Sequence, residues 1–363
     1  MNSFDNVFKN KNVLITGHTG FKGSWLSIWL NELGANVIGY ALEPLTKEDN
    51  FVLTGIEKKI THIIGDIRDR GNLQNVFDKY RPEFVFHLAA QAIVRESYKN
   101  PVETYETNIM GTVNVLEAVR KAAYVRAAVI VTSDKCYDNK EWIWGYREND
   151  PMGGYDPYSS SKGCVELVVA SYRNSFFGED NKIKTAIVSA RAGNVIGGGD
   201  WANDRIFPDC IKALRKGDAI EIRNPGSVRP WQHVLESLSG YLKVCVEAYK
   251  EPKRYSGAWN FGPLHTSVLT VSDLVEKIIR YWGSGESRVA PNASNPHEAR
   301  YLTLDISKAV KQLNWKPILN ADNAIKMAVD WYQNYEKANV YDICVNQIRE
   351  YSRKREDQGR EEI

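Results

Sequence analysis

Cysteine is scarce in this chain, and long apolar runs are missing. The 363 residues hold five cysteines, with no Cys-x-x-Cys pair: Cys136, Cys164, Cys210, Cys245 and Cys344. Scattered thiols argue against a disulfide framework or a zinc site, so we expect no metal. No stretch approaches the ~20 apolar residues that a membrane-spanning helix needs. The N-terminal segment MNSFDNVFKNKN lacks the layout of a signal peptide, so we expect a cytoplasmic protein with no membrane partner.

Net charge is small as well. Lys and Arg number 47 against 45 Asp and Glu, for a formal net charge of +2. Without a basic field, nucleic acids and anionic membranes are poor partners. Hydrophobic residues make up 43% and charged residues 25%, which is typical of a globular protein. The length is sufficient for a large core and for two lobes.

What the sequence does contain, near its start, is a strand, a glycine-rich turn, a helix and a second strand. The apolar segment 11–16 runs into Gly17, Gly20 and Gly23, and helical spacing follows over 24–33. Glycines at these positions let the backbone turn tightly and approach a pyrophosphate at the helix N-terminus, where free N–H groups favour anions. The alternative is a glycine-rich turn without a ligand.

The second strand, at 36–42, bears on which dinucleotide fits. A 2′-phosphate requires an arginine near the end of this strand. The first arginine of the chain is Arg68, so the sequence favours NAD over NADP. The acidic partner of the ribose usually stands at the strand tip, where this chain has Ala41 and Leu42 instead.

Further strands and helices alternate up to residue 190. Apolar segments at 63–67, 83–90, 127–133 and 183–190 are separated by helical patterns that include 104–123 and 157–177. Such alternation predicts an α/β fold, with a Rossmann-type doubly wound parallel sheet.

The pattern loosens after Arg191, which predicts a smaller, discontinuous C-terminal domain. We expect a NAD-binding Rossmann domain over 1–190 with returning segments at about 234–262, a substrate-binding domain over 191–233 and 263–348, and a mobile charged tail over 349–363.

Polar side chains follow the strand at 127–133, whose end carries Ser133, Asp134 and Lys135. Doubly wound sheets bind ligands outside the carboxyl ends of their strands, although a polar turn that closes a strand would look the same.

Tyr158 and Lys162 open the helix at 157–177 and share one helical face. A nearby cation lowers the tyrosine pKa from its usual value of about 10. Tyr158 then becomes a usable base near neutrality.

Five segments together resemble the extended short-chain dehydrogenase/reductases that act on nucleotide sugars: TGHTGFKG (16–23), GDIRD (65–69), HLAAQ (87–91), VTSDKCY (131–137) and YSSSK (158–162). The resemblance covers nearly the whole chain up to about Tyr335. Within this group, the loop sequence FKG, the triplet SDK, and the stretches RAGNVIGGGDW (191–201) and RNPGSVRPWQHV (223–234) are most similar to the family of CDP-glucose 4,6-dehydratases.

The resemblance implies conversion of CDP-D-glucose to CDP-4-keto-6-deoxy-D-glucose and water by internal hydride transfer through bound NAD, in deoxysugar and lipopolysaccharide (O-antigen) biosynthesis. Tyr158, helped by Lys162, would deprotonate the 4′-hydroxyl, and Ser133 would hydrogen-bond that oxygen. Asp134 would protonate the departing 6′-oxygen, and Lys135 would take the C5′ proton. The related dTDP-glucose enzymes carry glutamate where this chain has Lys135.

Further contacts follow from the same resemblance. It implies a cofactor site formed by Gly17, His18, Thr19, Gly20, Phe21, Lys22, Gly23, Asp66, Ile67, Leu88, Ala89, Ala90, Thr107, Tyr158 and Lys162. It implies substrate contacts by Gln91, Asn194, Arg205, Glu221, Arg223, Arg229, Asn260 and His297. Arginines suit the diphosphate because their guanidinium groups bind phosphate oxygens in pairs. We also expect the His18 imidazole to crowd the pyrophosphate and weaken NAD retention, whereas Lys22 offers a phosphate ligand.

Rival readings remain. A 4-epimerase shares the glycine loop and the Tyr/Lys pair but needs no acid and base for elimination, so Asp134 and Lys135 favour a dehydratase. A dTDP- or UDP-hexose dehydratase is equally compatible with the motifs. A dinucleotide-sensing protein without catalysis belongs to another class, and such proteins tend to lack the Tyr/Lys pair. By the same resemblance, helices 104–123 and 157–177 suggest a homodimer through a four-helix bundle, with a homotetramer as a further option.

Overall fold

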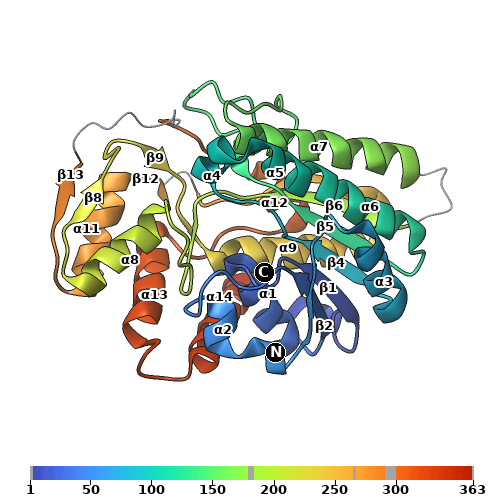
Figure 1. Ribbon diagram of the computed structural model, residues 1–363, viewed down its shortest axis with the longest axis horizontal. Helices are drawn as coiled ribbons and strands as arrows, with labels where there is room; N and C mark the ends of the chain where they lie inside the picture. Colours follow the sequence, from blue (N-terminus) through green and yellow to red (C-terminus); the bar gives the residue numbers. More distant parts are fainter. Residues whose placement is uncertain (1–2, 179–183, 265–266, 291–299, 362–363) are drawn as a thin grey trace.

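The centre of the computed structural model is a seven-stranded parallel sheet (Figure 1). The model describes all residues except 1–2, 179–183, 265–266, 291–299 and 362–363. In chain order the strands are β1 (Asn12–Thr16), β2 (Asn36–Ala41), β3 (Thr61–Ile64), β4 (Phe84–His87), β5 (Ala127–Val131), β6 (Ala186–Arg191) and β11 (Gly257–Asn260). Their spatial order is β11-β6-β5-β4-β1-β2-β3, and every pairing is parallel. The expected Rossmann-type sheet is confirmed.

Helices cover both faces of this sheet because side chains alternate along each strand. Val13 and Ile15 belong to one core and Leu14 to the other. The first core includes α1 (Phe21–Glu32), α9 (Val234–Lys250) and α14 (Val340–Glu361). The second includes α3 (Arg70–Tyr80), α6 (Gly111–Lys121) and α7 (Pro157–Phe176). Burying each such aliphatic side chain contributes about 1.5–3 kcal/mol, so the two cores fix the position of the strand ends between them.

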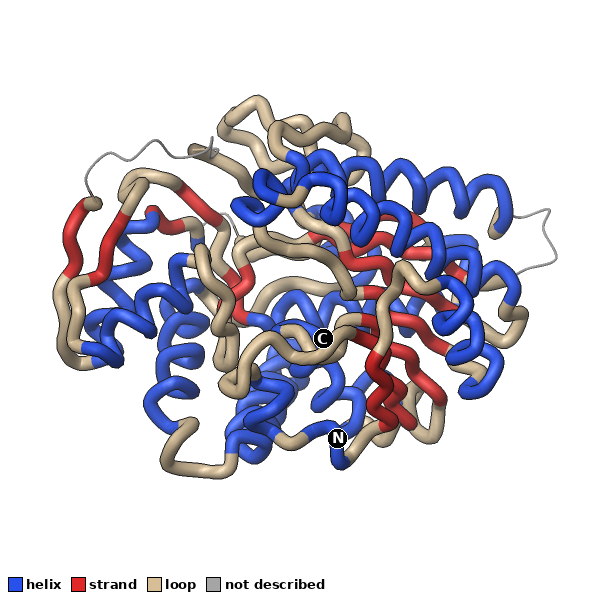
Figure 2. Tube along the Cα trace, in the orientation of Figure 1, coloured by secondary structure: helices blue, strands red, loops and turns tan. Residues whose placement is uncertain are grey.

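The C-terminal half adds a lobe of helices and short paired strands beside the sheet (Figure 2). Its strand pairs are β7 (Val195–Ile196) with β10 (Gln232–His233), β8 (Ile220–Ile222) with β13 (Ser287–Val289), and β9 (Val228–Arg229) with β12 (Leu269–Thr270). Its helices are α8 (Ile206–Lys216), α11 (Val271–Trp282) and α13 (Ala321–Asn334), whereas α12 (Ser307–Leu313) packs against α9 and against β11 of the sheet. The short helices elsewhere are α2 (Asn50–Thr54), α4 (Val94–Lys99), α5 (Pro101–Tyr105) and α10 (Pro252–Tyr255).

Two elements differ in detail from the expectations. The helix expected over 104–123 starts earlier, with Pro101 in its first turn, and passes through a π-helical turn at Glu106–Met110 before α6. Strand β3 ends at Ile64 rather than at residue 67, so Asp66 lies in the loop beyond it. Gly65 makes room there for the Tyr40 ring, which lies where a Cβ would stand.

The expected mobile tail at 349–363 is wrong for its described part, because residues 349–361 continue helix α14. Apolar residues at helical spacing, including Cys344, Ile348 and Tyr351, are buried on one side of this helix. The Tyr351 hydroxyl donates to buried Glu236 at 2.6 Å, which ties the helix to α9. None of the helices in the described part is long and apolar enough to cross a membrane.

Candidate active site

The turn after β5 places a carboxyl group in a confined position. Ser133 caps a short 3-10 helix, Asp134–Cys136, by accepting from the Lys135 backbone N–H at 3.2 Å. The Ser133 hydroxyl also donates to Oδ1 of Asp134 at 2.9 Å. Asp134 is 2% exposed, and its Oδ2 has no hydrogen-bond partner in the described part of the chain. A Cβ added to Gly193 would stand only 1.8 Å from that oxygen, so the carboxyl group has little freedom to turn.

Helix α7 brings the tyrosine and lysine to the same place. Asp156 caps the helix by accepting from the Ser159 N–H at 2.9 Å. Gly163 allows the helix to lie against the turn, because a Cβ there would be 3.3 Å from the carbonyl oxygen of Cys136. Tyr158 and Lys162 are both buried, and the Lys162 ammonium lies 6.0 Å from the centre of the Tyr158 ring.

The expected lowering of the Tyr158 pKa is wrong for this structure. Burial raises the pKa of the phenol to about 12, and the hydrogen bond with Ser133 offsets this only in part. Burial also lowers the pKa of the Lys162 ammonium to about 8. Desolvation penalises the charged form of each group, and for both groups it is the largest influence on the pKa. Lys162 therefore loses its proton before Tyr158 does.

The glycine loop has the shape of an anion cradle. Gly17 has a φ of +77°, and a Cβ there would be 2.6 Å from the backbone nitrogen of Ala89. A Cβ on Gly23 would be 2.1 Å from the carbonyl oxygen of Gly17. Helix α1 starts at Phe21, so its first-turn N–H groups, which have no acceptor within the helix, open onto this loop. The glycines of the loop and the alanines after β4 carry no bulky side chains, so they would let a pyrophosphate approach the backbone.

The His18 ring points away from this loop, so the expected crowding of the pyrophosphate is wrong, while weakened NAD retention stays a prediction. The His18 imidazole is completely buried and its Nε2 lies 2.6 Å from Nδ1 of His62. The ring occupies the space where a Cβ of Gly39 would be, 2.3 Å from the nearest ring atom. Burial, followed by the charge of His62, lowers the pKa of His18 to about 3, so the imidazole is neutral.

Lys22, in the first turn of α1, lies near the predicted catalytic residues Asp134 and Lys162. Its ammonium lies 3.5 Å from the Tyr241 hydroxyl. Burial and then the Arg205 charge lower its pKa to about 8, and smaller effects come from Asp134 and Lys162. Arg205 is held by Asp200 at 2.9 Å. The structure therefore brings Lys22 and Arg205 together with the predicted catalytic residues.

Asn108 is a site-building residue that sequence reasoning missed. Its side chain donates to the carbonyl of Gln91 at 3.1 Å and to Ser161 at 2.8 Å, and accepts from the Gln91 N–H at 2.8 Å. It therefore links the loop after β4 to helix α7. Thr107 is half-buried beside it in the π-helical turn. The π-helical turn sets the position of Asn108, and residue spacing in the sequence does not reveal such a turn.

The remaining cofactor candidates lie at the ends of β3 and β4. Asp66 is paired with Arg68, whose backbone N–H and guanidinium both reach it, the latter at 2.6 Å. Ile67 is buried and packs where a Cβ of Gly111 would stand. Leu88, Ala89 and Ala90 are half-buried.

The substrate candidates are dispersed. Arg223 lies 3.5 Å from Asp204 and 3.7 Å from Asp209. Glu221 is exposed and paired with Arg288 at 2.8 Å. Arg229 is 6% exposed and donates to the carbonyls of Val228 and Arg300. His297 lies outside the described residues.

Three amide side chains complete this set. Asn260 is completely buried, and its amide bonds to Tyr137, Tyr146 and Asp305. A structural role therefore replaces its expected contact with substrate. The Gln91 side chain donates to the Ile93 carbonyl and the Thr104 hydroxyl and accepts from the Ile93 N–H. Asn194 follows β6 with a φ of 50° and is half-buried.

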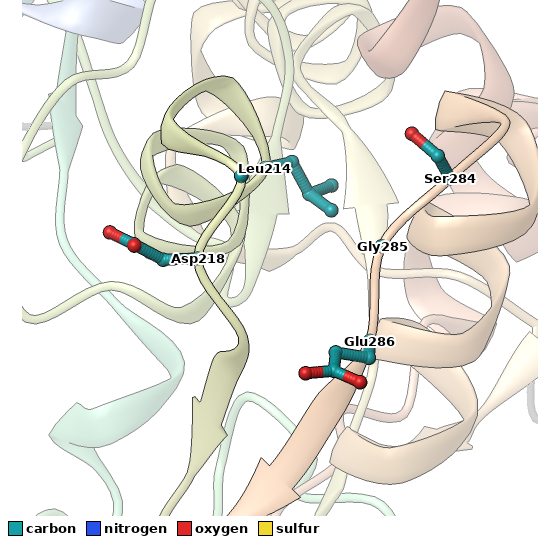
Figure 3. Close-up of a pocket in the computed structure, with 6 residues that line it drawn as sticks. Leu214, Asp218, Ser284, Gly285 and Glu286 are labelled. Carbon is teal, nitrogen blue, oxygen red and sulfur yellow. The ribbon is translucent and has the colours of Figure 1, made fainter.

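A separate hollow of about 230 Å³ lies in the outer lobe (Figure 3), between the end of α8 and β13. It is lined by Leu214, Gly217, Asp218, Ser284, Gly285 and Glu286. Its two carboxylates disfavour an anionic nucleotide. We therefore place the active site at the strand ends rather than in this hollow.

The parallel sheet, the glycine loop and the Tyr158/Lys162 pair define an extended short-chain dehydrogenase/reductase. The model of the GDP-mannose 4,6 dehydratase family matches residues 14–328, and the chain belongs to this family. It is 50% identical over 341 residues to the CDP-glucose 4,6-dehydratase of Salmonella typhimurium, which covers 93% of this chain and 95% of that protein. The expected resemblance is confirmed.

Solved structures agree on the fold. The UDP-glucose 4-epimerase of Thermotoga maritima, solved with UDP-glucose, superposes with a TM-score of 0.75 at 23% identity and covers 90% of this chain and 100% of its own. The dTDP-glucose 4,6-dehydratase of Bacillus anthracis, solved in complex with NAD, gives 0.74 at 20% identity and covers 92% of this chain and 99% of its own.

Proposed function

We propose that this protein is a CDP-glucose 4,6-dehydratase, which converts CDP-D-glucose to CDP-4-keto-6-deoxy-D-glucose and water. The observation that carries the proposal is the Asp134 carboxyl group, confined against Gly193 beside Tyr158. An epimerase needs no acid there, whereas elimination of the 6′-hydroxyl does. The 50% identity to the Salmonella enzyme supports CDP as the nucleotide. The cellular role would be deoxysugar and O-antigen synthesis in the cytoplasm.

NAD is the cofactor that fits the glycine loop. Bound there, it would supply the hydride acceptor for the sugar C4′ and the hydride donor for C6′. The N–H groups at the start of α1 would hold the pyrophosphate, and Ala89 allows close approach at Gly17. The tip of β2 carries no arginine for a 2′-phosphate, which favours NAD over NADP.

Tyr158 and Lys162 act as a pair in the first proton transfer. Tyr158 takes the proton of the 4′-hydroxyl, and Ser133 hydrogen-bonds the same oxygen. To accept that proton, Tyr158 first passes its own proton to neutral Lys162, and the resulting ammonium stabilises the phenolate. Since the pKa of Lys162 is about 8 and that of Tyr158 about 12, the pair releases its first proton near pH 8.

Asp134 and Lys135 serve the elimination. The ketone at C4′ acidifies the C5′ proton, which Lys135 removes, and Asp134 protonates the departing 6′-oxygen. Cations for the diphosphate come from Arg205, Lys22, Arg223 and Arg229.

The test is an assay of CDP-, dTDP- and UDP-glucose side by side, with the ultraviolet absorbance of the 4-keto sugar in alkali as readout. We expect product from CDP-glucose with a kcat/KM well above the other two. A product that is an epimerised hexose without the 4-keto absorbance would refute the dehydratase. Preference for dTDP- or UDP-glucose would refute the nucleotide alone.

We further propose a homodimer formed by α5, α6 and α7, which lie side by side in Figure 1. Large apolar side chains are exposed at Val102 on α5 (67%), Met110 in the π-helical turn before α6 (52%) and Leu167 on α7 (61%). Pairing with a second copy would bury them, and two such dimers could form a tetramer. Sedimentation of Leu167→Glu tests this, with a monomer expected and an unchanged dimer contradicting it.

The division into a Rossmann domain (1–190 and about 234–262) and a substrate domain (191–233 and 263–348) also remains our proposal.

A further inference from the structure

Glu166 is a buried charge beneath the active site that the reaction itself does not use. It lies on α7, one helical turn after Lys162 and two after Tyr158, so the three side chains share one face. Its side chain is 3% exposed. Buried carboxylates are costly unless every oxygen has partners. Both carboxylate oxygens of Glu166 accept hydrogen bonds.

The partners of Glu166 come from the two strands that end at the site. Thr132, directly before Ser133, donates to Oε1 at 2.5 Å. Ser189 and Arg191 of β6 donate to Oε2, each at 2.7 Å. One carboxylate therefore joins the catalytic helix to the ends of β5 and β6.

The same network continues below the turn. The second Nη of Arg191 donates to the Tyr137 hydroxyl at 2.6 Å and to the Glu148 carbonyl at 3.0 Å. Thr132 is also held by its backbone, whose N–H bonds to Ala190 at 2.9 Å. Residues 132–134 are thus fixed relative to α7 by side-chain and backbone bonds together.

We propose that Glu166 is a positioning residue of this active site, which sets the turn at 132–134 against helix α7 and supplies the negative charge that keeps Lys162 protonated. The proposal rests on the proposed function in that Tyr158 and Lys162 are taken as the catalytic pair. The Arg191 charge and the hydrogen bonds hold the pKa of Glu166 below its usual range although burial opposes this, so the carboxylate stays charged.

Other charges face these groups and enter the balance. Around Lys162 and Glu166 they are Cys136, Asp134 and Arg191 at the strand ends, Arg173 on α7, Lys22 on the glycine loop and His87 on β4. His87 is neutral, because burial lowers its pKa to about 3. Burial raises the pKa of the Cys136 thiol, which is therefore neutral too. Among these groups, Glu166 is the carboxylate that an arginine holds in its charged form.

The effect of the Glu166 charge is tested by following the titration of Lys162 in the full chain with ¹³C-ε-lysine NMR. The Lys162 resonance is assigned by its loss in Lys162→Met. In Glu166→Gln the titration midpoint should fall by roughly one pH unit. Ser189→Ala is the matched control, since it removes one bond to Glu166 and keeps the charge, so its midpoint should stay. An unchanged midpoint in Glu166→Gln, or an equal shift in Ser189→Ala, would overturn the proposal. This readout needs no substrate.

The positioning is tested by comparing two variants that each remove one hydroxyl from Glu166. Thr132→Val, next to Ser133, should lower kcat about tenfold at unchanged KM, whereas Ser189→Ala should stay within about twofold. Equal losses in kcat would overturn it. Should Glu166→Gln fail to fold, Glu166→Asp keeps the charge and should lower kcat with the Lys162 midpoint unchanged; a lowered midpoint would overturn it. A wild type inactive on all three nucleotide sugars refutes the proposed function, while the NMR still decides the charge.

Discussion

Replacing Gly193 with alanine should slow the reaction strongly while the protein stays folded. The added methyl group would stand 1.8 Å from Oδ2 of Asp134 and 2.1 Å from its Cγ. Carbon and oxygen in ordinary contact are about 3.4 Å apart, so the carboxyl group must move by about 1.5 Å. That movement breaks its 2.9 Å hydrogen bond with Ser133. A misplacement of 1 Å costs roughly 100-fold in rate, so we expect kcat to fall by about 100-fold or more.

Stability should change little by comparison. Gly193 does not have a positive φ, so alanine is compatible with its backbone, and the loss of one hydrogen bond costs about 1 kcal/mol. The assay is kcat from 4-keto product, with the melting temperature alongside. Gly226→Ala is the matched control, because no atom lies within 4 Å of its added Cβ.

A double-mutant cycle shows whether the effect passes through the carboxyl group. In an Asp134→Ala background, Gly193→Ala should lower kcat little further, since the group that it displaces is already gone. Wild-type turnover in Gly193→Ala, or an equal loss in both backgrounds, would refute the reasoning.

Three further variants or conditions test other parts of the structure. Lys135→Ala should keep its fold and bind CDP-glucose but lose deuterium wash-in at C5 of the sugar; normal exchange would remove Lys135 from the base role. Burial lowers the pKa of His18, His87 and His233 to about 3, below the unfolded value of 6.5. The unfolded chain therefore binds more protons below pH 6.5, and each histidine should cost roughly 2 kcal/mol by pH 5. A melting temperature constant from pH 7 to pH 5 would contradict this. Tyr351→Phe should lower the free energy of unfolding by about 2 kcal/mol and leave kcat unchanged, because Glu236 loses a 2.6 Å hydrogen bond far from the reacting groups.

The sheet and the glycine loop could be predicted from the sequence because their signals are local. The apolar strand at Ala127–Val131 and the glycines before α1 express short-range rules of burial and backbone freedom. The pairing of Tyr158 with Lys162 on one helical face is also local. The direction in which the Tyr158 pKa shifts could not be predicted, because the burial of the phenol depends on what the rest of the chain packs over it.

Contacts between distant segments account for what was missed. The confinement of Asp134 depends on Gly193, which lies on the far side of helix α7 in the sequence. The position of the His18 ring depends on Gly39 and His62, which belong to two neighbouring strands. The helix at the C-terminus was available from apolar spacing but was hidden by its many charged residues, which form its exposed side.

The charges around the catalytic turn fit an anionic substrate. Burial is the main reason that the pKa values of Lys22 and Lys162 are lowered to about 8, so the charged form of each lysine is disfavoured in the free protein. Asp200 is paired with Arg205 at 2.9 Å and Glu166 with Arg191 at 2.7 Å, so each carboxylate shares its charge between an arginine and the nearby lysine. A nucleoside diphosphate brings the missing negative charge, and in its presence both lysines should hold their protons more firmly. The cation-rich cluster that is costly in the free protein thereby becomes a source of affinity for the diphosphate, and it places the sugar beside the one carboxyl group that Gly193 keeps in position.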